Sequence, residues 1–590
     1  MLHSLPRTLC ELSKVKQTFG NETCLMSNQQ HHHQPLLPPE ATTILRDVFG
    51  FSKFRSYQQQ IIARVLHGKS TLAILPTGAG KSLTYQLPAQ LLPQATVVIS
   101  PLIALMKDQL DRLPPALQQR ATVINSTLSG HEMRERLRAI AAGTYKLVYI
   151  APERLRQRSF LYALRRCGVA RLVIDEAHCI SLWGQHFRPD YLFIRRAITE
   201  LGTPPVLAVT ATAATDTINA IKTMLGPLDV IQAPIFRPNL FFQVVRIRSG
   251  MSRVRSVIEL CQQINGPIII YARARQRCEE LACELRLAGI AADHYHALHP
   301  DREAVQERFM NGKTRVLVAT VAFGMGVDKA DIRAVIHYNL PPSLEAYYQE
   351  AGRAGRDGWP ARCILFFSES DANTLRQWLQ STLITRPKLR ELYRHIRKMI
   401  EYPVGVIDLN ALQDQLGSDG ETLVRVGISV LEQVGVLRRH FDLPLSAIVE
   451  RRTANLHTPD WLRQFPQEAV EIDLVMLARQ YNLPVPQIEA VLLEAQASGQ
   501  LLYRPGLRLP LIECLPVPPD VGDRIDHWLA TAQQWQERRI EAAVNYARQA
   551  RCRHQLLAAY FGQQLTACRT SCDVCAPSHA LSVGIRKRHG

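Results

Sequence analysis

The stretch TLAILPTGAGKS, residues 71–82, decides the fold of this protein. Its first four residues are apolar or β-branched and indicate a buried strand, and a helical pattern begins at Leu83. A glycine-containing loop between a strand and a helix offers backbone N–H groups that cradle phosphate oxygens. Lys81 would add a fixed positive charge, and the Ser82 hydroxyl would ligate Mg²⁺. The stretch therefore predicts a nucleotide-phosphate site, although Leu75 stands where the usual pattern has glycine.

Two carboxylates follow a second predicted strand. Asp175 and Glu176 come directly after the apolar residues 172–174, and ligands bind at the carboxyl ends of parallel strands. Asp175 would hold Mg²⁺ together with Ser82, and Glu176 would polarise the attacking water. In the alternative interpretation, the acidic pair only caps a helix. The presence of Lys81 in the same chain favours hydrolysis.

Short β-branched runs alternate with longer helical stretches from about residue 40 to residue 370. One set of runs lies at 96–99, 147–150, 172–174 and 206–209, and a second set lies at 267–271, 316–319 and 335–338. This alternation is typical of doubly wound parallel sheets. Because a connection near 226–250 separates the two sets, we expect an α/β fold with two such lobes.

Two arginines stand three residues apart in the second lobe. Arg353 and Arg356 lie among small residues in the segment 349–358, where guanidinium groups can approach a γ-phosphate closely. An arginine finger accelerates related phosphoryl transfers by about 10³- to 10⁵-fold. Since these arginines come from the other lobe, lobe closure would depend on nucleotide state. We predict as catalytic residues Lys81, Asp175, Glu176, Arg353 and Arg356.

Residues 49–370 resemble the RecQ family of superfamily 2 DNA helicases. Phe51, Arg55 and Gln58 match the adenine-recognition motif of that family, in which Phe51 would stack on the base and the other two would read its edge. Residues 210–213 and 319–329 match its linkage motif and its fifth motif. The resemblance implies two RecA-like lobes that bind ATP. The ATP site would contain Phe51, Arg55, Gln58, Thr77, Gly78, Gly80, Lys81, Ser82, Asp175 and Gln349.

The segment that follows Glu176 resembles the aromatic-rich loop of the same family. By that resemblance Trp183, Phe187 and Arg188 would sense single-stranded DNA and relay its binding to ATP hydrolysis. Stacking on an aromatic side chain contributes about 1–3 kcal/mol per base. Leu182 and the pair at 185–186 differ from the family's usual residues.

Beyond residue 385 a pattern of helix, turn, helix, glycine and strand appears twice. Gly435 and Gly499 suit the two helix ends, and residues 436–439 and 501–504 read as strands. These repeats predict two winged-helix-like units. Residues 438–441, near a possible hairpin tip, favour contact with DNA, and the alternative is a packing platform that touches no DNA.

Four late cysteines are separated by fifteen, three and two residues, namely Cys552, Cys568, Cys572 and Cys575. This distribution is typical of a structural four-thiolate Zn²⁺ site. Four free thiols and a redox pair of Cys572 with Cys575 are the alternatives. The segment that begins at Cys552 resembles the zinc-binding region of RecQ helicases. In that family the region usually follows the motor directly, whereas residues 386–519 intervene here.

These patterns divide the chain into seven parts: a disordered tail at 1–38, RecA-like lobes at 39–227 and 228–385, winged-helix-like domains at 386–455 and 456–519, a helical zinc-binding module at 520–578, and a basic tail at 579–590.

Bulk composition limits the partners and the compartment. The chain has 70 Lys plus Arg against 52 Asp plus Glu, a formal charge of +18, which favours a polyanion such as nucleic acid. Nine of the 13 cysteines are scattered without pairing logic, which indicates a reducing compartment. No apolar run is long enough to cross a membrane. We expect a cytoplasmic, nucleoid-associated protein that uses ATP, Mg²⁺ and Zn²⁺.

The function expected from these features is an ATP-dependent DNA helicase that acts on single-stranded and forked DNA. Translocation from 3′ to 5′, and a role in repair and recombination, come from the family resemblance alone. One alternative is an RNA helicase, because phosphate contacts carry no base information. A second is a nucleotide-switched protein that binds or anneals DNA without separating strands.

Overall fold

The computed structural model describes residues 36–125, 127–180, 189–248, 251–324, 329–381, 383–400, 403–417, 420–452, 461–462 and 465–583. Residues 37–590 form one compact unit. The predicted tail at 1–38 lies almost wholly outside the described residues, as does most of the predicted basic tail at 579–590.

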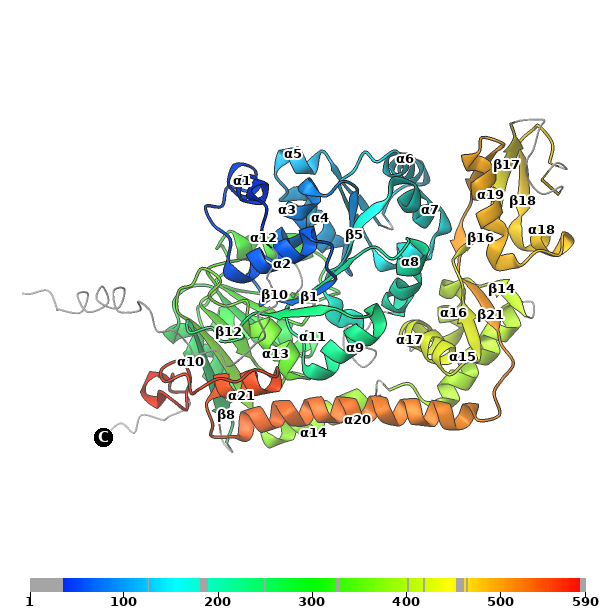
Figure 1. The fold of residues 1–590 in the computed structure, drawn as a ribbon. Helices are drawn as coiled ribbons and strands as arrows, with labels where there is room; N and C mark the ends of the chain where they lie inside the picture. The colour runs from blue at the N-terminus through cyan, green and yellow to red at the C-terminus, as the bar shows by residue number, and fades with distance from the viewer. Residues whose placement is uncertain are drawn as a thin grey trace, which may run out of the picture. The chain divides into compact units, whose positions relative to one another are not determined.

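A seven-stranded parallel sheet forms the first lobe (Figure 1). The strand order is β3 (Ala121–Ile124), β4 (Leu147–Ile150), β2 (Ala95–Ile99), β5 (Val169–Ile174), β6 (Val206–Thr210), β1 (Thr71–Ile74) and β7 (Asp229–Gln232). Its helices are α1 (Pro39–Asp47), α2 (Ser56–Leu66), α3 (Leu83–Leu91), α4 (Ile103–Asp111), α5 (Pro115–Gln118), α6 (Gly130–Ala141), α7 (Arg158–Cys167), α8 (Ile194–Glu200) and α9 (Thr215–Leu225). The central strands are buried along their whole length because helices cover both faces of the sheet.

The second lobe is a six-stranded parallel sheet. Its strand order is β10 (Ala292–Tyr295), β11 (Val316–Ala319), β9 (Ile268–Tyr271), β12 (Ala334–His337), β13 (Ala361–Phe367) and β8 (Leu240–Arg246). Its helices are α10 (Arg253–Gln263), α11 (Arg275–Leu287), α12 (Arg302–Met310), α13 (Leu344–Ala351) and α14 (Glu369–Ser381). The predicted α/β class with two tandem parallel-sheet lobes is confirmed.

The boundary between the lobes lies later than the predicted residue 227. Strand β7 pairs in parallel with β1, from Thr71 opposite Asp229 to Ile74 opposite Gln232, and so belongs to the first sheet. Its first two residues are exposed, which is why the sequence alone gave it no strand signal.

The two units predicted to be winged-helix-like, called the winged units below, are nested rather than consecutive. The first contains α15 (Arg386–Met399), α16 (Leu409–Leu416), α17 (Gly420–Gln433) and the sheet β14 (Val404–Val406), β21 (Leu511–Cys514), β15 (Leu437–Arg439). The second contains α18 (Leu474–Gln480), α19 (Ile488–Ala497) and the sheet β18 (Val470–Asp473), β17 (Ser446–Arg451), β19 (Leu501–Pro505). Between them, β16 (Leu443–Pro444) pairs with β20 (Arg508–Leu509). The predicted boundary between residues 455 and 456 does not match this strand pairing. Strand β17 precedes that boundary but belongs to the second unit, and β21 follows it but completes the sheet of the first unit.

The segment after β15 packs against the first lobe. The Phe441 ring is 3% exposed and meets the Phe193 ring edge to face at 5.0 Å, and the Arg158 guanidinium lies 4.3 Å from its centroid. Arg439 pairs with Asp190 at 3.4 Å. The expectation that residues 438–441 form a DNA-contacting tip is wrong for His440 and Phe441, because both are buried. Arg439 is partly buried in its pair with Asp190.

Replacing Phe441 with alanine is expected to lower the free energy of unfolding by about 3–5 kcal/mol, the usual cost of truncating a buried phenylalanine. Urea denaturation would measure the loss. Leu445→Ala is a suitable control, since Leu445 lies in the same region and is 44% exposed. Equal losses in the two variants would contradict the docking role of Phe441.

Helix α20 (Val521–Arg548) carries the chain from the first winged unit back to the second lobe, as Figure 1 shows in orange. Near its start, Trp528 Nε1 donates to Gln433 Oε1 at 3.0 Å. Farther along, Arg539 pairs with Glu345 of α13 at 3.2 Å, and Arg376 of α14 pairs with Glu537. The short helix α21 (Arg553–Tyr560) follows.

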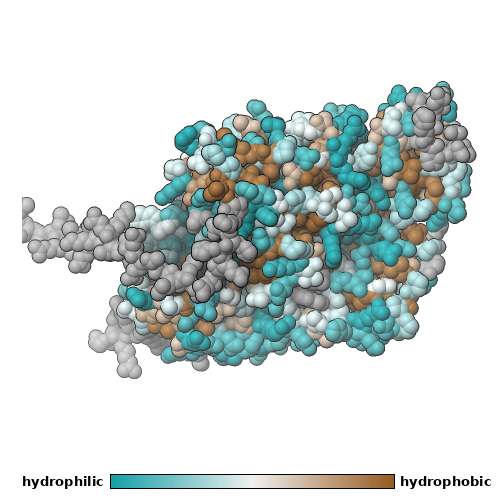
Figure 2. Space-filling model, in the orientation of Figure 1, coloured by the Kyte–Doolittle hydropathy of each residue, from teal (hydrophilic) through white to brown (hydrophobic). Residues whose placement is uncertain are grey.

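Among the described residues, no helix is both long enough and apolar enough to cross a membrane. On the face drawn in Figure 2, hydrophobic residues form separate patches among hydrophilic ones.

Candidate active site and metal centre

The phosphate loop runs from the end of β1 to the start of α3. Gly78 and Gly80 adopt positive φ angles of 80° and 76°, a conformation that glycine reaches without the cost that a Cβ imposes. The buried Gln58 side chain holds the loop, because its Nε2 donates to Ala79 O at 3.0 Å and to Gly80 O at 3.2 Å. A Cβ placed on Gly80 would lie 2.4 Å from that nitrogen. The turn requires glycine here, and a side chain at position 80 would also displace the Gln58 amide from the loop.

Gly80→Ala is therefore expected to weaken ATP binding strongly, in addition to a stability cost of about 1–2 kcal/mol for a left-handed residue. Gly143→Ala is the matched control, since Gly143 has a φ of 73° with no atom within 4 Å of an added Cβ. It should show the stability cost with an unchanged KM for ATP. Thermal unfolding and steady-state ATPase assays would separate the two effects, and equal KM values in both variants would contradict the steric role.

The two carboxylates lie where β5 ends, as predicted. Glu176 Oε1 lies 3.6 Å from Lys81 Nζ, so the side chains that would act on phosphate and water are adjacent. Glu176 adopts a φ of 48°, a strained conformation that clusters at functional sites. Burial, together with Glu176, raises the pKa of Asp175 to about 6, and Lys81 opposes this rise. The site therefore concentrates negative charge where little water can reach it, and a bound cation would stabilise that charge.

His178 connects the carboxylates to the neighbouring strand. Its Nδ1 lies 3.3 Å from Glu176 Oε2 and 3.2 Å from Thr210 Oγ1 at the end of β6. Burial lowers the pKa of His178, but Cys179 and Glu176 more than offset it and raise this pKa to about 10. A positively charged His178 would hold Glu176 in a fixed position.

The arginine segment of the second lobe lies directly against the phosphate loop. A Cβ on Gly78 would meet Arg356 Cγ at 3.4 Å, and one on Gly352 would meet Thr77 Oγ1 at 3.8 Å. Arg353 has different surroundings, because it is buried and its Nη2 lies 3.4 Å from a Cβ placed on Gly324 of its own lobe. Arg356 is thus the arginine that crosses to the nucleotide loop.

Arg237, which the sequence did not single out, fixes the backbone of this arginine segment. Its guanidinium donates to Gly352 O at 2.8 Å, to Ala354 O at 3.0 Å and to Gly355 O at 2.7 Å. A lone arginine in a connection between lobes gives no signal of such a role, since the acceptors lie more than 100 residues away in the chain.

Two of the residues proposed to recognise adenine, Arg55 and Gln58, contact the loop. Phe51 is 54% exposed, which leaves its ring face available for stacking. The Arg55 guanidinium donates to Gly78 O, and Gln58 Oε1 accepts from Arg55 N at 3.0 Å. Gln349 is half-buried on α13, one turn before Arg353. Trp183, Phe187 and Arg188, the predicted DNA-coupling residues, lie outside the described residues.

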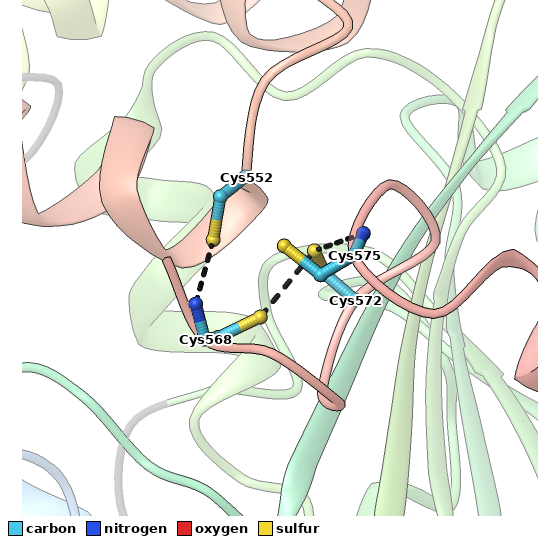
Figure 3. Close-up of side chains that lie close together, drawn as sticks. All are labelled: Cys552, Cys568, Cys572 and Cys575. Atoms are coloured by element: carbon cyan, nitrogen blue, oxygen red, sulfur yellow. Dashed lines mark hydrogen bonds between the residues drawn. The ribbon is translucent and has the colours of Figure 1, made fainter. Parts of the chain in front are cut away.

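The four late cysteines converge around the start of α21. Their sulfur atoms all lie within 4.8 Å of one another, and Figure 3 shows them turned toward a common space. Backbone N–H groups of Cys568 and Cys575 donate to the sulfurs of Cys552 and Cys572 at 3.3 and 3.4 Å. Such N–H contacts stabilise thiolates, the form that binds metal. Four sulfur ligands at these separations fit Zn²⁺.

The cysteine loop extends the sheet of the second lobe at its β8 edge. Phe242 N donates to Ser571 O at 3.1 Å, and Asp573 N donates to Phe242 O at 2.9 Å. The buried His554 ring meets Phe242 edge to face at 4.9 Å, and Arg553 holds Asp573 at 2.8 Å. The module therefore docks on the motor although residues 386–519 separate the two in sequence.

Three family descriptions match the chain in this order. "DEAD/DEAH box helicase" matches residues 55–221, "Helicase conserved C-terminal domain" matches 251–358, and "RecQ zinc-binding" matches 523–576. The last match contains all four cysteines, which supports the zinc centre independently of its geometry.

Several curated proteins are similar to the chain. "Probable ATP-dependent DNA helicase RecS" of Bacillus subtilis (strain 168) is 37% identical over 427 residues, which cover 71% of this chain and 85% of that protein. "ATP-dependent DNA helicase RecQ" of the same organism is 41% identical over 369 residues, covering 61% and 62%. Its counterpart from Pasteurella multocida (strain Pm70) is 39% identical over 368 residues, covering 60% and 56%.

Two parallel-sheet lobes, with a phosphate loop and paired carboxylates in one and an approaching arginine in the other, define a two-lobed ATP-driven helicase motor. The zinc-binding module and the relatives make the assignment more specific. The chain belongs to the RecQ family of ATP-dependent DNA helicases.

Proposed function

We propose that this protein couples ATP hydrolysis to translocation from 3′ to 5′ along single-stranded DNA, and thereby unwinds forked duplexes in repair and recombination. The observation that carries the proposal is the approach of Arg356, from the second lobe, to Gly78 of the phosphate loop in the first lobe. Hydrolysis that needs groups from both lobes would change how the lobes contact each other. Such a change is what a motor requires.

Each polar group of the site has a role in this proposal. Lys81 and the loop amides would hold the β- and γ-phosphates, while Ser82 and Asp175 would hold Mg²⁺, which neutralises developing charge on the phosphates when bound. Glu176, oriented by Lys81 and His178, would position and polarise the attacking water. Arg356 would stabilise charge on the transferred phosphoryl group, and Arg353 would support the segment that carries it.

DNA recognition in the proposal rests on charge and on the aromatic-rich loop. The net charge of +18 favours the phosphate backbone. Trp183 and Phe187 would stack on bases, and Arg188 would contact the strand. Relatives named as DNA helicases support DNA over RNA as the substrate. A cytoplasmic location, close to the nucleoid, is part of the same proposal.

Unwinding of matched 3′-tailed and 5′-tailed forks tests the proposal directly. We expect ATP-dependent opening of the 3′-tailed DNA fork, and none with Glu176→Gln, which removes the carboxylate but keeps the side-chain size. Opening of only the 5′-tailed fork would overturn the polarity. Stronger ATPase stimulation by RNA would favour an RNA helicase, and hydrolysis with annealing but no strand separation would favour a nucleotide-switched binding protein.

A further inference from the structure

A second cluster of metal-binding side chains lies far in sequence from the zinc cysteines. Glu279 on α11 and His294 and His296 at the end of β10 place one ligand atom each within 4.8 Å of one another. His296 Nε2 lies 2.9 Å from Glu279 Oε1, and the rings of His294 and His296 stack with centroids 5.5 Å apart. Strand β10 is the edge strand of the second lobe, so the cluster lies at the rim of that sheet.

Burial sets His296 apart from an ordinary surface histidine. It is 5% exposed, and its Nδ1 has no hydrogen-bond partner among the residues that the structure describes. A buried imidazole nitrogen without a partner is costly. Glu279, by contrast, keeps about half of its side chain exposed, so the cluster is open to an ion from solvent.

The chemistry of the donors selects the class of ion. Two imidazoles and one carboxylate suit Zn²⁺, Co²⁺, Ni²⁺ or Cu²⁺ better than Mg²⁺ or Ca²⁺, which prefer oxygen ligands. His299 contacts the cluster from outside, its ring 4.8 Å from that of His294 while its Nδ1 accepts from Asp301 N at 3.1 Å.

The cluster also borders a segment of the motor. Tyr295, between the two histidines, meets Phe323 edge to face at 4.9 Å, and its carbonyl accepts from Thr320 N at 3.1 Å. Thr320 and Phe323 lie in the segment that resembles the fifth motif of the family. An ion held by Glu279, His294 and His296 would therefore fix the end of the strand against which this segment packs.

We propose that Glu279, His294 and His296 form a second metal site, specific for a divalent transition-metal ion and with at least one position open to water. Three protein ligands with an open position are typical of Zn²⁺ sites that exchange a ligand, whereas four thiolates form a closed structural site. The proposal does not rest on unwinding activity or on its polarity.

Metal stoichiometry of the full chain tests the proposal. The parent for the test replaces the three consecutive histidines His31, His32 and His33 with alanine, because such a tract can take up Zn²⁺ when the metal is in excess. After loading with excess Zn²⁺ and desalting, elemental analysis should find two ions per chain. His294→Ala and Glu279→Gln should each leave one, and both variants should keep the circular dichroism spectrum of the parent. His131→Ala removes a histidine from another His–Glu pair and should still bind two.

A Co²⁺ titration identifies the ligands. With Zn²⁺ already in the cysteine site, Co²⁺ should add a visible spectrum without the intense sulfur-to-cobalt band of thiolate ligation, and His294→Ala should lack this spectrum. One zinc ion per chain in the parent, two in His294→Ala, or a thiolate-type cobalt spectrum would each overturn the proposal. The first of these results would leave His296 and Glu279 as a simple hydrogen-bonded pair.

Discussion

Arg356→Ala is expected to lower the kcat for DNA-stimulated ATP hydrolysis by about 10³- to 10⁵-fold, the range over which an arginine finger acts in related phosphoryl transfers. The side chain lies against Gly78 of the phosphate loop. Its guanidinium would stabilise the negative charge that develops on the transferred phosphoryl group only in the transition state. ATP binding in the ground state should therefore change much less than kcat. Single-turnover hydrolysis and nucleotide-binding titrations would measure the two quantities separately.

Two further variants make this result specific. Arg356→Lys keeps the charge but loses the planar guanidinium, so it should recover only a small part of the rate. Arg255→Ala removes an arginine that is exposed on α10 and paired with Glu259 one turn away, and should hydrolyse ATP at the normal rate. A decrease of less than tenfold in Arg356→Ala would exclude the finger role.

Removal of zinc is expected to unfold the module at 520–578, since structural zinc sites supply about 10–16 kcal/mol of folding free energy in small domains. The effect should spread to the second lobe, because Phe242 N and Val244 N of β8 bond to Ser571 O and Asp573 Oδ2 at 3.1 and 2.9 Å. Hydrogen exchange should show loss of protection at these two amides, while the buried central strand β9 remains protected.

Cys572→Ser should reproduce the effect of a chelator, because Cys572 is fully buried and lies between two of the other ligands. Cys283→Ser is the control, as Cys283 is an exposed free thiol on α11. Full protection of Phe242 and Val244 in zinc-free protein would show that the module folds and docks without its metal.

The motor could be predicted because its signals are local. A buried strand, a glycine loop and a helix follow one another at 71–91, and the two acidic residues follow β5 in the same way. A strand, a loop or a helix can each be predicted from residues that are neighbours in the chain. The order of these elements along the chain then determines which strand ends lie at the same edge of the sheet. The sequence also places Arg356 in the second lobe, and its position against Gly78 follows once the two lobes face each other across the nucleotide site.

The carboxyl-terminal half could not be predicted to the same depth, because its arrangement depends on pairing between distant residues. Four residues, Leu511–Cys514, complete a sheet whose other strands lie at Val404–Val406 and Leu437–Arg439. Such short strands carry no signal of the strand with which they pair. The sequence pattern therefore predicts two consecutive units. Phe441 lies in a segment whose sequence is typical of an exposed hairpin tip. It is buried only because the first lobe packs against it. Glu279 joins two histidines that the sequence places 15 or more residues later.

Helix α20 is a long, stiff connection between the second lobe and the first winged unit. An α-helix of 28 residues is about 42 Å long and resists bending over that distance. Its last turns share the core of the second lobe, while its first turns contact the first winged unit through Trp528. Phe441 anchors that region to the first lobe. Any rotation of one lobe against the other must therefore strain or shift these contacts, and an ATP-driven movement would reach the winged units without passing through a flexible linker.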